Sequence, residues 1–130
     1  MKHVEVVAAV IIRDGKVFAA QRKDAGEMAC RWEFPGGKVE DGESSEEALV
    51  REIREELDSV ISVDRYIMTV EHAYHSFSLT MHAYLCTLVE GELSLEEHLA
   101  FRWLDKDSLF SVAWADADVP IAQAIKDRVV

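Results

Sequence analysis

The sequence predicts one α/β domain in which a mixed β-sheet packs against helices. The chain has 130 residues, 49% of them hydrophobic, and three tryptophans, which suits a single domain with a proper core. Segments with the pattern of strands outnumber those with helical periodicity, and the two kinds do not alternate strictly. A mixed sheet is the architecture that fits this order. The expected domain spans residues 1–130.

The chain is expected to begin with a β-hairpin. Val4–Ile12 is rich in β-branched residues, and Val17–Gln21 is a second apolar run. Asp14-Gly15 lies between the two runs and is a strong signal for a tight hairpin turn. A loop should follow, and then a short extended piece at residues 32–35 that ends in a proline.

A helix is expected in the middle of the chain. Ser44 begins it, because Glu47 three residues later completes a capping box. Glu47 and Arg51 are also spaced as a favourable i,i+4 ion pair. The helix should end just before Asp58, which would take the left-handed cap position that glycine usually occupies. An apolar stripe that can dock the helix on a core consists of Leu49, Ile53 and Leu57.

Strand patterns dominate the second half of the chain. The expected strands are residues 60–63, 66–75, 77–86 and 101–104. Residues 88–95 have the composition of a loop, and residues 105–108 are expected to start a short helix. A C-terminal helix should follow Asp118, which stands near its N-cap and precedes a proline and a helical apolar pattern.

Charge and cysteine usage narrow the classes of partner. The net charge of −11, from 14 basic and 25 acidic residues, disfavours a nucleic-acid polymer or an anionic membrane as partner. A small phosphorylated substrate is compatible with it, because a bound metal ion can invert the local field. Cys30 and Cys86 lie far apart without CxxC spacing and are expected to be buried free thiols, with a disulfide between them as the alternative. No segment predicts a membrane span or a signal peptide, so the expected location is cytoplasmic. The oligomeric state cannot be predicted from these features.

The central helix concentrates negative charge on one side. Glu52, Glu55 and Glu56 fall within about a third of the helix circumference, next to the apolar stripe. Like charges at this spacing oppose each other by roughly 0.2–0.5 kcal/mol per pair. A hard divalent cation with oxygen ligands would account for such a patch. An ordinary charged surface helix is the alternative.

The spacing of this region resembles the Nudix box, GX5EX7REUXEEXGU, in which U is a bulky aliphatic residue. The stretch runs GGKVEDGESSEEALVREIREELD from Gly36. Its matching positions are Gly37, Glu43, Arg51, Glu52, Ile53, Glu55 and Glu56. Asp58 and Ser59 depart from the pattern, and Val60 can take the aliphatic role one position later. The preceding WEFPGGKVE and the flank lengths resemble the MutT-like branch of the family, so the resemblance covers essentially the whole chain.

The resemblance implies an α/β/α sandwich, with the mixed sheet between helices. It also implies hydrolysis of a nucleoside triphosphate to monophosphate and pyrophosphate, dependent on Mg²⁺ or alternatively Mn²⁺. The implied metal ligands are the Gly37 carbonyl and three carboxylates, Glu52, Glu55 and Glu56. Arg51 would hold Glu52 or Glu43 in position by charge-assisted hydrogen bonds, or else form a surface ion pair with Glu47 or Glu55.

A further acid is expected from the loop before the strand at 101–104. Glu97 is the choice by register and Glu96 the next, and a solvated loop glutamate is the alternative. In the family this loop can provide a metal ligand or the general base.

Substrate contacts are implied outside the helix. Arg22 and Lys38 could contact phosphates, although Arg22 could equally be a solvated strand end. Asp118 would select a base that has hydrogen-bond donors, and a helix N-cap is its other interpretation. Residues that could line the base pocket, or equally form core, are Val4, Val6, Phe34, Tyr74 and Phe77.

The implied substrate is a modified or non-standard (d)NTP, and two versions stay open. One is 8-oxo-dGTP and the other is a CTP/dCTP-type nucleotide. Hydrolysis of a nucleotide sugar or a dinucleoside polyphosphate is an alternative within the family. A catalytically silent nucleotide-binding module on the same fold is an alternative from another class.

Overall fold

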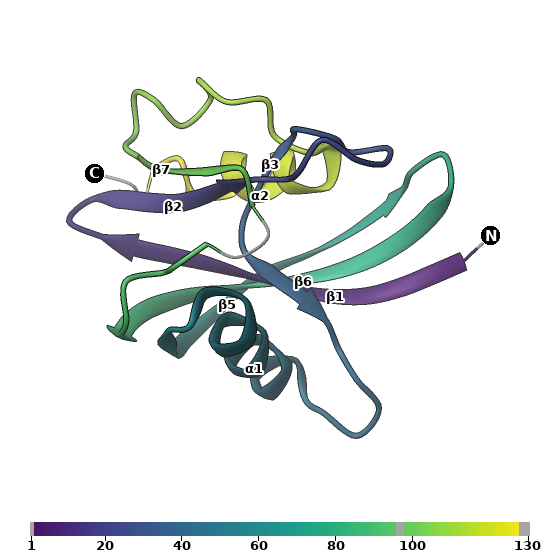
Figure 1. Cartoon of the computed structure of the whole chain (residues 1–130), viewed down its shortest axis with the longest axis horizontal. Coiled ribbons are helices and arrows are strands. Elements are labelled where there is room, and N and C mark those ends of the chain that lie inside the picture. Colours follow the sequence, from purple (N-terminus) through teal and green to yellow (C-terminus); the bar gives the residue numbers. More distant parts are fainter. Residues whose placement is uncertain (1, 96–97, 128–130) are drawn as a thin grey trace.

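The fold comes from a computed structural model that describes residues 2–95 and 98–127. Figure 1 shows a twisted sheet with one helix on each side, which confirms the expected α/β/α class. The elements in chain order are β1 (Lys2–Arg13), β2 (Lys16–Gln21), β3 (Trp32–Glu33), β4 (Gly36–Lys38), α1 (Ser45–Leu57), β5 (Val60–Ala73), β6 (Phe77–Glu90), β7 (Ala100–Leu104), the 3₁₀ turn η1 (Asp116–Asp118) and α2 (Val119–Ile125).

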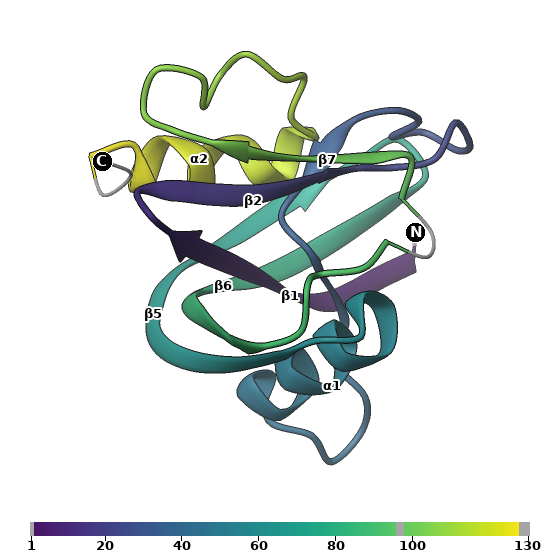
Figure 2. The same cartoon turned by 60° about the vertical axis from the view of Figure 1, so that its left-hand side comes forward.

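Strand β1 is the centre of the sheet. The strand order is β3-β2-β1-β6-β5, with β4 also paired to β1 and β7 to β2. The β1–β6 pairing is parallel, whereas the other pairings are antiparallel. Side chains of β1 are buried on both faces: Ala8 and Val10 face the α2 layer, and Val7 and Ile11 face the α1 layer. Figure 2 shows the two helices on opposite faces of the sheet.

Helix α1 begins and ends where the local signals predict. The Ser44 side chain accepts a hydrogen bond from the Glu47 N–H, and the Glu47 side chain accepts one from the Ser44 N–H. The helix ends at Asp58, whose φ of 47° and ψ of 44° are left-handed. The stripe that docks α1 on the sheet is completely buried and consists of Leu49, Ile53 and Leu57. With this stripe docked, Glu52 and Glu56 line a cavity beside β4.

Ser59 has a structural role at the exit of α1. Its hydroxyl is buried, donates to the Leu57 carbonyl oxygen over 2.9 Å and accepts from the Leu93 N–H over 2.9 Å. A side chain at Gly91 would overlap this hydroxyl. Ser59 departs from the aliphatic residue of the motif, but its small hydroxyl side chain ties the exit of α1 to the loop after β6 by hydrogen bonds.

The strands of the second half are longer than the sequence predicts. A single strand, β5, replaces the two expected at 60–63 and 66–75, and it has register shifts at three places. Such bulges let a strand bend without ending. Strand β6 runs to Glu90, so the expected loop at 88–95 begins three residues later.

The prediction that residues 105–108 start a short helix is wrong. The chain forms turns there, because the Asp105 carboxylate accepts hydrogen bonds from the Asp107 N–H and the Ser108 N–H. Side-chain bonds of this kind compete with the backbone bonds of a helix. The Ser108 hydroxyl also donates to this carboxylate. This bond is the largest cause that lowers the pKa of Asp105, and the two backbone bonds lower it further.

Two further features concern the environment of the chain. Cys30 and Cys86 are both free, and burial raises the pKa of the Cys86 thiol to about 12. Within the described residues, neither helix has the length and apolar character that crossing a membrane requires.

Candidate active site

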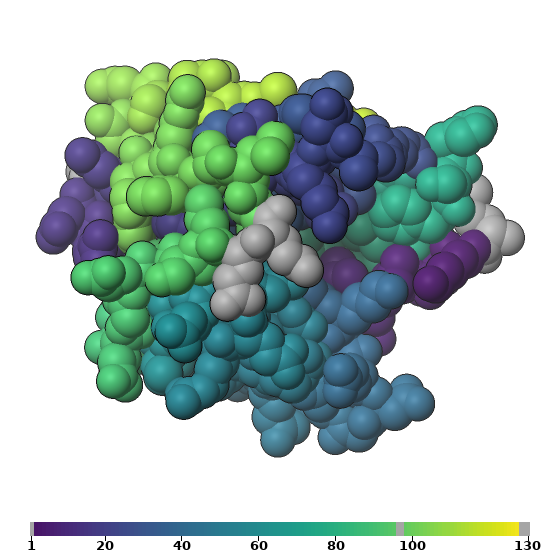
Figure 3. Space-filling model, in the orientation of Figure 1, coloured from purple at the N-terminus to yellow at the C-terminus, as the bar shows by residue number. Residues whose placement is uncertain are grey.

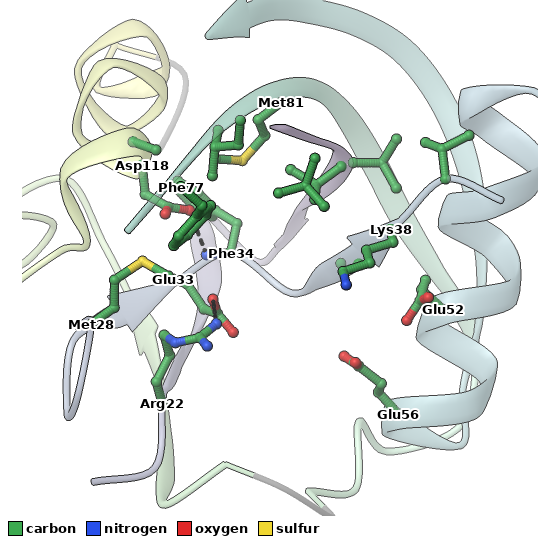
Figure 4. A pocket seen from close by; sticks show the side chains of 18 of the residues that line it. Arg22, Met28, Glu33, Phe34, Lys38, Glu52, Glu56, Phe77, Met81 and Asp118 are labelled. Carbon is green, nitrogen blue, oxygen red and sulfur yellow. Dashed lines mark hydrogen bonds and ion pairs between the residues drawn. The ribbon is translucent and has the colours of Figure 1, made fainter. Parts of the chain in front are cut away.

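A cavity of about 640 Å³ lies between α1, β4 and the sheet, and it joins two chemically different ends. One end holds Glu52, Glu56 and Lys38. The other end lies beside the loop after β2 and the β5–β6 hairpin, which abut on the face shown in Figure 3. Figure 4 shows Phe34, Phe77 and Met81 gathered at this second end, away from the two glutamates. The cavity is therefore polar at one end and largely apolar at the other.

Strand β4 brings a bare backbone against the acidic face of α1. A Cβ at Gly37 would overlap the Glu52 carboxyl group, and a Cβ at Gly36 would overlap the Val7 carbonyl oxygen. Both positions therefore require glycine. The close approach puts the Gly37 backbone beside a carboxylate that is itself largely buried, with 13% of its side chain exposed.

Arg51 organises the carboxylates around it. Its guanidinium is bidentate to Glu43, with Nε–Oε2 2.7 Å and Nη2–Oε1 2.9 Å. It also donates to Glu52 over 3.0 Å, to Glu55 over 3.1 Å and to the Lys38 carbonyl oxygen over 3.0 Å. The bond to Glu43 is the main cause that raises the pKa of Arg51, and the same bond lowers the pKa of Glu43. Arg51 therefore bonds Glu43 and Glu52 at the same time, and these are the two glutamates that it was expected to hold.

The expected ion pair between Glu47 and Arg51 is wrong. Glu47 is held in the capping box of α1, while Arg51 turns toward Glu43 on the preceding loop. The bidentate geometry with Glu43 is stronger than a single exposed i,i+4 pair. Of the two surface pairs weighed for Arg51, only that with Glu55 forms among the described residues.

The three helical carboxylates differ in where they point. Glu52 and Glu56 line the cavity, as Figure 4 shows, whereas Glu55 is bonded to Arg51 and has 61% of its side chain exposed. Across residues 2–95 and 98–127, no three His, Cys, Asp or Glu side chains are grouped closely enough to hold a metal ion. Glu97 and Glu96 lie outside the described residues.

Arg22 has a carboxylate partner that sequence reasoning missed. Its Nη1 donates to Glu33 over 2.8 Å, and Nε2 of His98, a side chain only 8% exposed, lies 2.8 Å from the other Glu33 oxygen. Burial raises the pKa of Glu33, but the bonds from His98 and Arg22 outweigh it and lower the pKa overall. The one signal in the sequence is an acid inside the short apolar strand WEFP, where strand alternation turns it away from its aromatic neighbours.

Asp118 lies at the apolar end, but its side chain does not cap α2. The carboxyl group is 4% exposed, and its Oδ1 accepts from the Phe34 N–H over 3.1 Å. Burial, followed by the nearby negative charge of Glu33, raises its pKa well above the usual range. The N-cap interpretation is thus corrected, because the side chain accepts from the Phe34 N–H just after β3 and makes no capping bond to α2. A neutral carboxyl offers one donor as well as acceptors.

The apolar end is built from aromatic pairs. Tyr74 stacks on Phe77 at 5.2 Å between ring centroids, and Phe34 stacks on Trp114 at 4.5 Å. The Tyr74 hydroxyl accepts from the Ala117 N–H over 2.9 Å, which joins this wall to the start of α2. All five expected pocket residues line the cavity, and the lining residues that the sequence did not indicate include Met28, Leu79 and Met81.

A comparison with models of protein families shows which family the chain belongs to. A model of the NUDIX domain matches residues 6–124, which is most of the chain. The chain belongs to the Nudix family.

Relatives of this Nudix protein are similar over nearly its whole length. The CTP pyrophosphohydrolase of Escherichia coli (strain K12) is 40% identical over 124 residues, which cover 95% of this chain and 92% of that protein. The 8-oxo-dGTP diphosphatase of Proteus vulgaris is 37% identical over 94 residues, or 72% of this chain and 84% of that protein. The solution structure of the E. coli ORF135 protein has a TM-score of 0.85 at 39% identity and covers 98% of this chain and 91% of that one. These similarities confirm the expected family, fold and enzyme class, a Nudix hydrolase.

Nudix hydrolases generally use a divalent metal ion, and the chemistry of this end of the cavity fits one. Carboxylates from α1 and a close backbone at Gly37 are hard oxygen ligands. A small divalent ion that keeps several waters needs only one or two carboxylates together with substrate phosphate oxygens. Glu52 and Glu56 are placed for that task, and Arg51 holds the Glu52 carboxylate in one orientation.

Proposed function

We propose that this Nudix hydrolase converts a (d)NTP, modified or non-standard, to a nucleoside monophosphate and pyrophosphate with Mg²⁺ as cofactor. One observation is the main support. A single cavity joins the Glu52 and Glu56 carboxylates to an aromatic end with Asp118, so one nucleotide can occupy both. The phosphates would lie at the carboxylate end and the base at the aromatic end. A small nucleotide substrate and two free cysteines suit a cytoplasmic location.

At the phosphate end, each residue would have a separate task. Glu52, Glu55, Glu56 and the Gly37 carbonyl oxygen would hold the metal, with Glu55 released from Arg51 when it joins. Bound Mg²⁺ would neutralise phosphate charge and lower the pKa of the attacking water. Arg51 would keep the Glu52 oxygens from turning away from the metal.

Two cations and one acid complete the proposed catalytic set. Lys38 lines the cavity and would contact a phosphate oxygen. Arg22 would do so less directly, because Glu33 already holds its guanidinium. Glu97 is the proposed additional acid from the loop before β7.

At the base end, Asp118 would read the edge of the base. A neutral carboxyl group can donate to one base atom and accept from its neighbour. Cytosine matches this with N3 and N4–H₂, and a guanine matches it with O6 and N1–H, so the hydrogen bonding suits both substrate versions. The aromatic rings of Phe34, Tyr74 and Phe77 would pack around the base.

A substrate panel tests the proposal. The protein is incubated with Mg²⁺ and each of CTP, dCTP, 8-oxo-dGTP and the ordinary dNTPs, together with a nucleotide sugar and a dinucleoside polyphosphate, and products are identified by chromatography. We expect monophosphate and pyrophosphate from CTP, dCTP or 8-oxo-dGTP. Preference for the sugar or dinucleoside substrate would replace the proposed substrate class. Binding without turnover across the panel would indicate a silent nucleotide-binding module instead.

A further inference from the structure

Two segments far apart in the sequence form the lips of the aromatic end of the cavity. The first is the loop from β2 to β3, residues 22–31, and the second is the turn between β5 and β6, residues 74–76. In Figures 1 and 2 the dark-blue loop lies beside the tip of the teal hairpin. Met28 lines the cavity from the first lip, Tyr74 lines it from the second, and Phe77 lines it from the start of β6 directly after the second lip. The separation of the lips therefore sets the space at this end.

One side chain, Glu27, joins the two lips. Its carboxylate accepts hydrogen bonds from the His75 N–H over 2.5 Å, the Ser76 N–H over 2.9 Å and the Ser76 hydroxyl over 2.7 Å. The bond from the His75 N–H is the largest of the causes that lower the pKa of Glu27, so the group stays ionised near neutral pH. Bonds of an ionised acceptor to several donors are the stronger class of hydrogen bond. We refer to this three-bond contact as the Glu27 clasp.

The clasp is the contact that ties the loop to the β5–β6 turn. The Gln21 side chain also donates to the Cys30 carbonyl oxygen at the base of the loop, and Met28 packs against the core. Among the described residues, the backbone hydrogen bonds of the loop join positions within 22–31 to each other, from Arg22–Arg31 at the base to Ala29–Gly26 at the tip. These bonds shape the loop but do not connect it to the β5–β6 turn. Glu27 supplies that connection, across 48 and 49 positions of sequence.

We propose that Glu27 is a positioning and specificity-determining residue that fixes the width of the base end of the substrate pocket. It acts through Met28, which it holds opposite Tyr74 and Phe77, and it makes no contact with the substrate itself. The proposal rests on the proposed function in one respect, which is that a nucleotide base occupies this end. Without the clasp the loop would share its time between closed and open positions, and affinity for a base would fall with the closed fraction.

The metal end should not depend on the clasp. Glu52, Glu56 and Arg51 are held by α1 and β4, which are anchored on β1 and by the capping box. Removing the clasp should therefore weaken binding only of the part of the substrate that carries the base. A nucleoside monophosphate and inorganic pyrophosphate are probes for the two ends.

The test compares Glu27→Ala with Glu27→Gln and with a control, Glu90→Ala, which removes an exposed carboxylate at the end of β6. Calorimetry with Mg²⁺ measures Kd for the monophosphate of the preferred substrate and for pyrophosphate, and steady-state kinetics gives KM and kcat. For Glu27→Ala we expect the monophosphate Kd and the KM to rise about tenfold, with pyrophosphate Kd and kcat within about twofold. Glu27→Gln keeps one acceptor oxygen, so its monophosphate Kd and KM should lie between those of the wild type and of Glu27→Ala. Glu90→Ala should match the wild type.

The proposal would be overturned by equal losses for monophosphate and pyrophosphate, which would indicate general destabilisation, or by no change in either. Amide hydrogen exchange at His75 and Ser76 gives a readout without activity. Protection in the wild type that is lost in Glu27→Ala supports the clasp, and fast exchange in both rejects it. Absence of turnover by the wild type would contradict the proposed function, while the exchange data at His75 and Ser76 would still decide for or against the clasp.

Discussion

At the scale of single residues, two carboxyl groups near each other at the base end have opposite pKa shifts. Glu33 has a lowered pKa because the bonds from His98 and Arg22 outweigh its burial. Asp118 has a raised pKa because it is buried and faces the charge of Glu33. The environments of the two groups therefore push their pKa values apart, a division typical of sites where acids have different roles.

Replacing Asp118 by Asn should stabilise the protein increasingly as pH rises above the unfolded-state pKa of an aspartate, about 3.9. Because the pKa of Asp118 is raised in the fold by burial, the folded state binds more protons than the unfolded chain, whose Asp pKa is about 3.9, and wild-type stability falls as pH rises above that value. An Asn oxygen can still accept from the Phe34 N–H without this cost. We expect Asp118→Asn to unfold at a higher urea concentration than the wild type. Its free energy of unfolding should be about 1–2 kcal/mol larger at pH 8, and this advantage should be gone near pH 3. An advantage that is equal at both pH values would show that folding does not raise the pKa of Asp118.

At the scale of elements, α1 is the part of the site that follows most directly from local sequence. The capping box places its start, the left-handed Asp58 places its end, and the buried stripe places its face. Each of these depends on residues a few positions apart. The bonds from Arg51 to Glu43 and Glu52 agree with the motif, whereas the i,i+4 pair with Glu47, inferred from helix spacing alone, does not form because Glu43 on the preceding loop takes the guanidinium.

Asp58→Gly should stabilise the exit of α1 without changing activity. The position has a φ of 47°, which glycine adopts without the strain that a side chain brings. The substitution also restores the glycine of the motif. We expect a gain of about 0.5–1 kcal/mol in urea unfolding, with kcat and KM as in the wild type. A loss of activity in a stable Asp58→Gly protein would mean that the Asp58 carboxylate has a role in the site.

At the scale of the whole molecule, the sheet brings together residues that no local pattern connects. Asp118 bonds to Phe34 across 84 positions, His98 to Glu33 across 65, and Ser76 to Glu27 across 49. The sequence predicted most strands, both helices and the acidic face of α1, because these depend on short-range periodicity. It could not predict the carboxylate pair or the Glu27 clasp, because these require the parallel β1–β6 pairing and the placement of α2.

Removal of divalent metal should abolish activity but preserve the fold. Two hydrophobic clusters, one on each face of the sheet, stabilise the molecule without any metal ligand. EDTA should therefore leave the circular dichroism spectrum unchanged and reduce turnover to background. Mg²⁺ with nucleoside monophosphate at 100 times its Kd should then stabilise the protein by about 2.7 kcal/mol. Unfolding by EDTA alone would indicate a structural metal site instead.

The most direct test of the account is the turnover of Glu56→Gln in Mg²⁺ with the preferred nucleotide, measured beside Glu46→Gln. Both glutamates are on α1, but Glu56 lines the cavity and Glu46 is exposed in the first turn. We expect kcat to fall at least about 100-fold in Glu56→Gln, as for loss of a metal-binding group, with an unchanged Tm, and to stay within about twofold in Glu46→Gln. Wild-type kcat in a folded Glu56→Gln protein would contradict a metal-dependent site on α1.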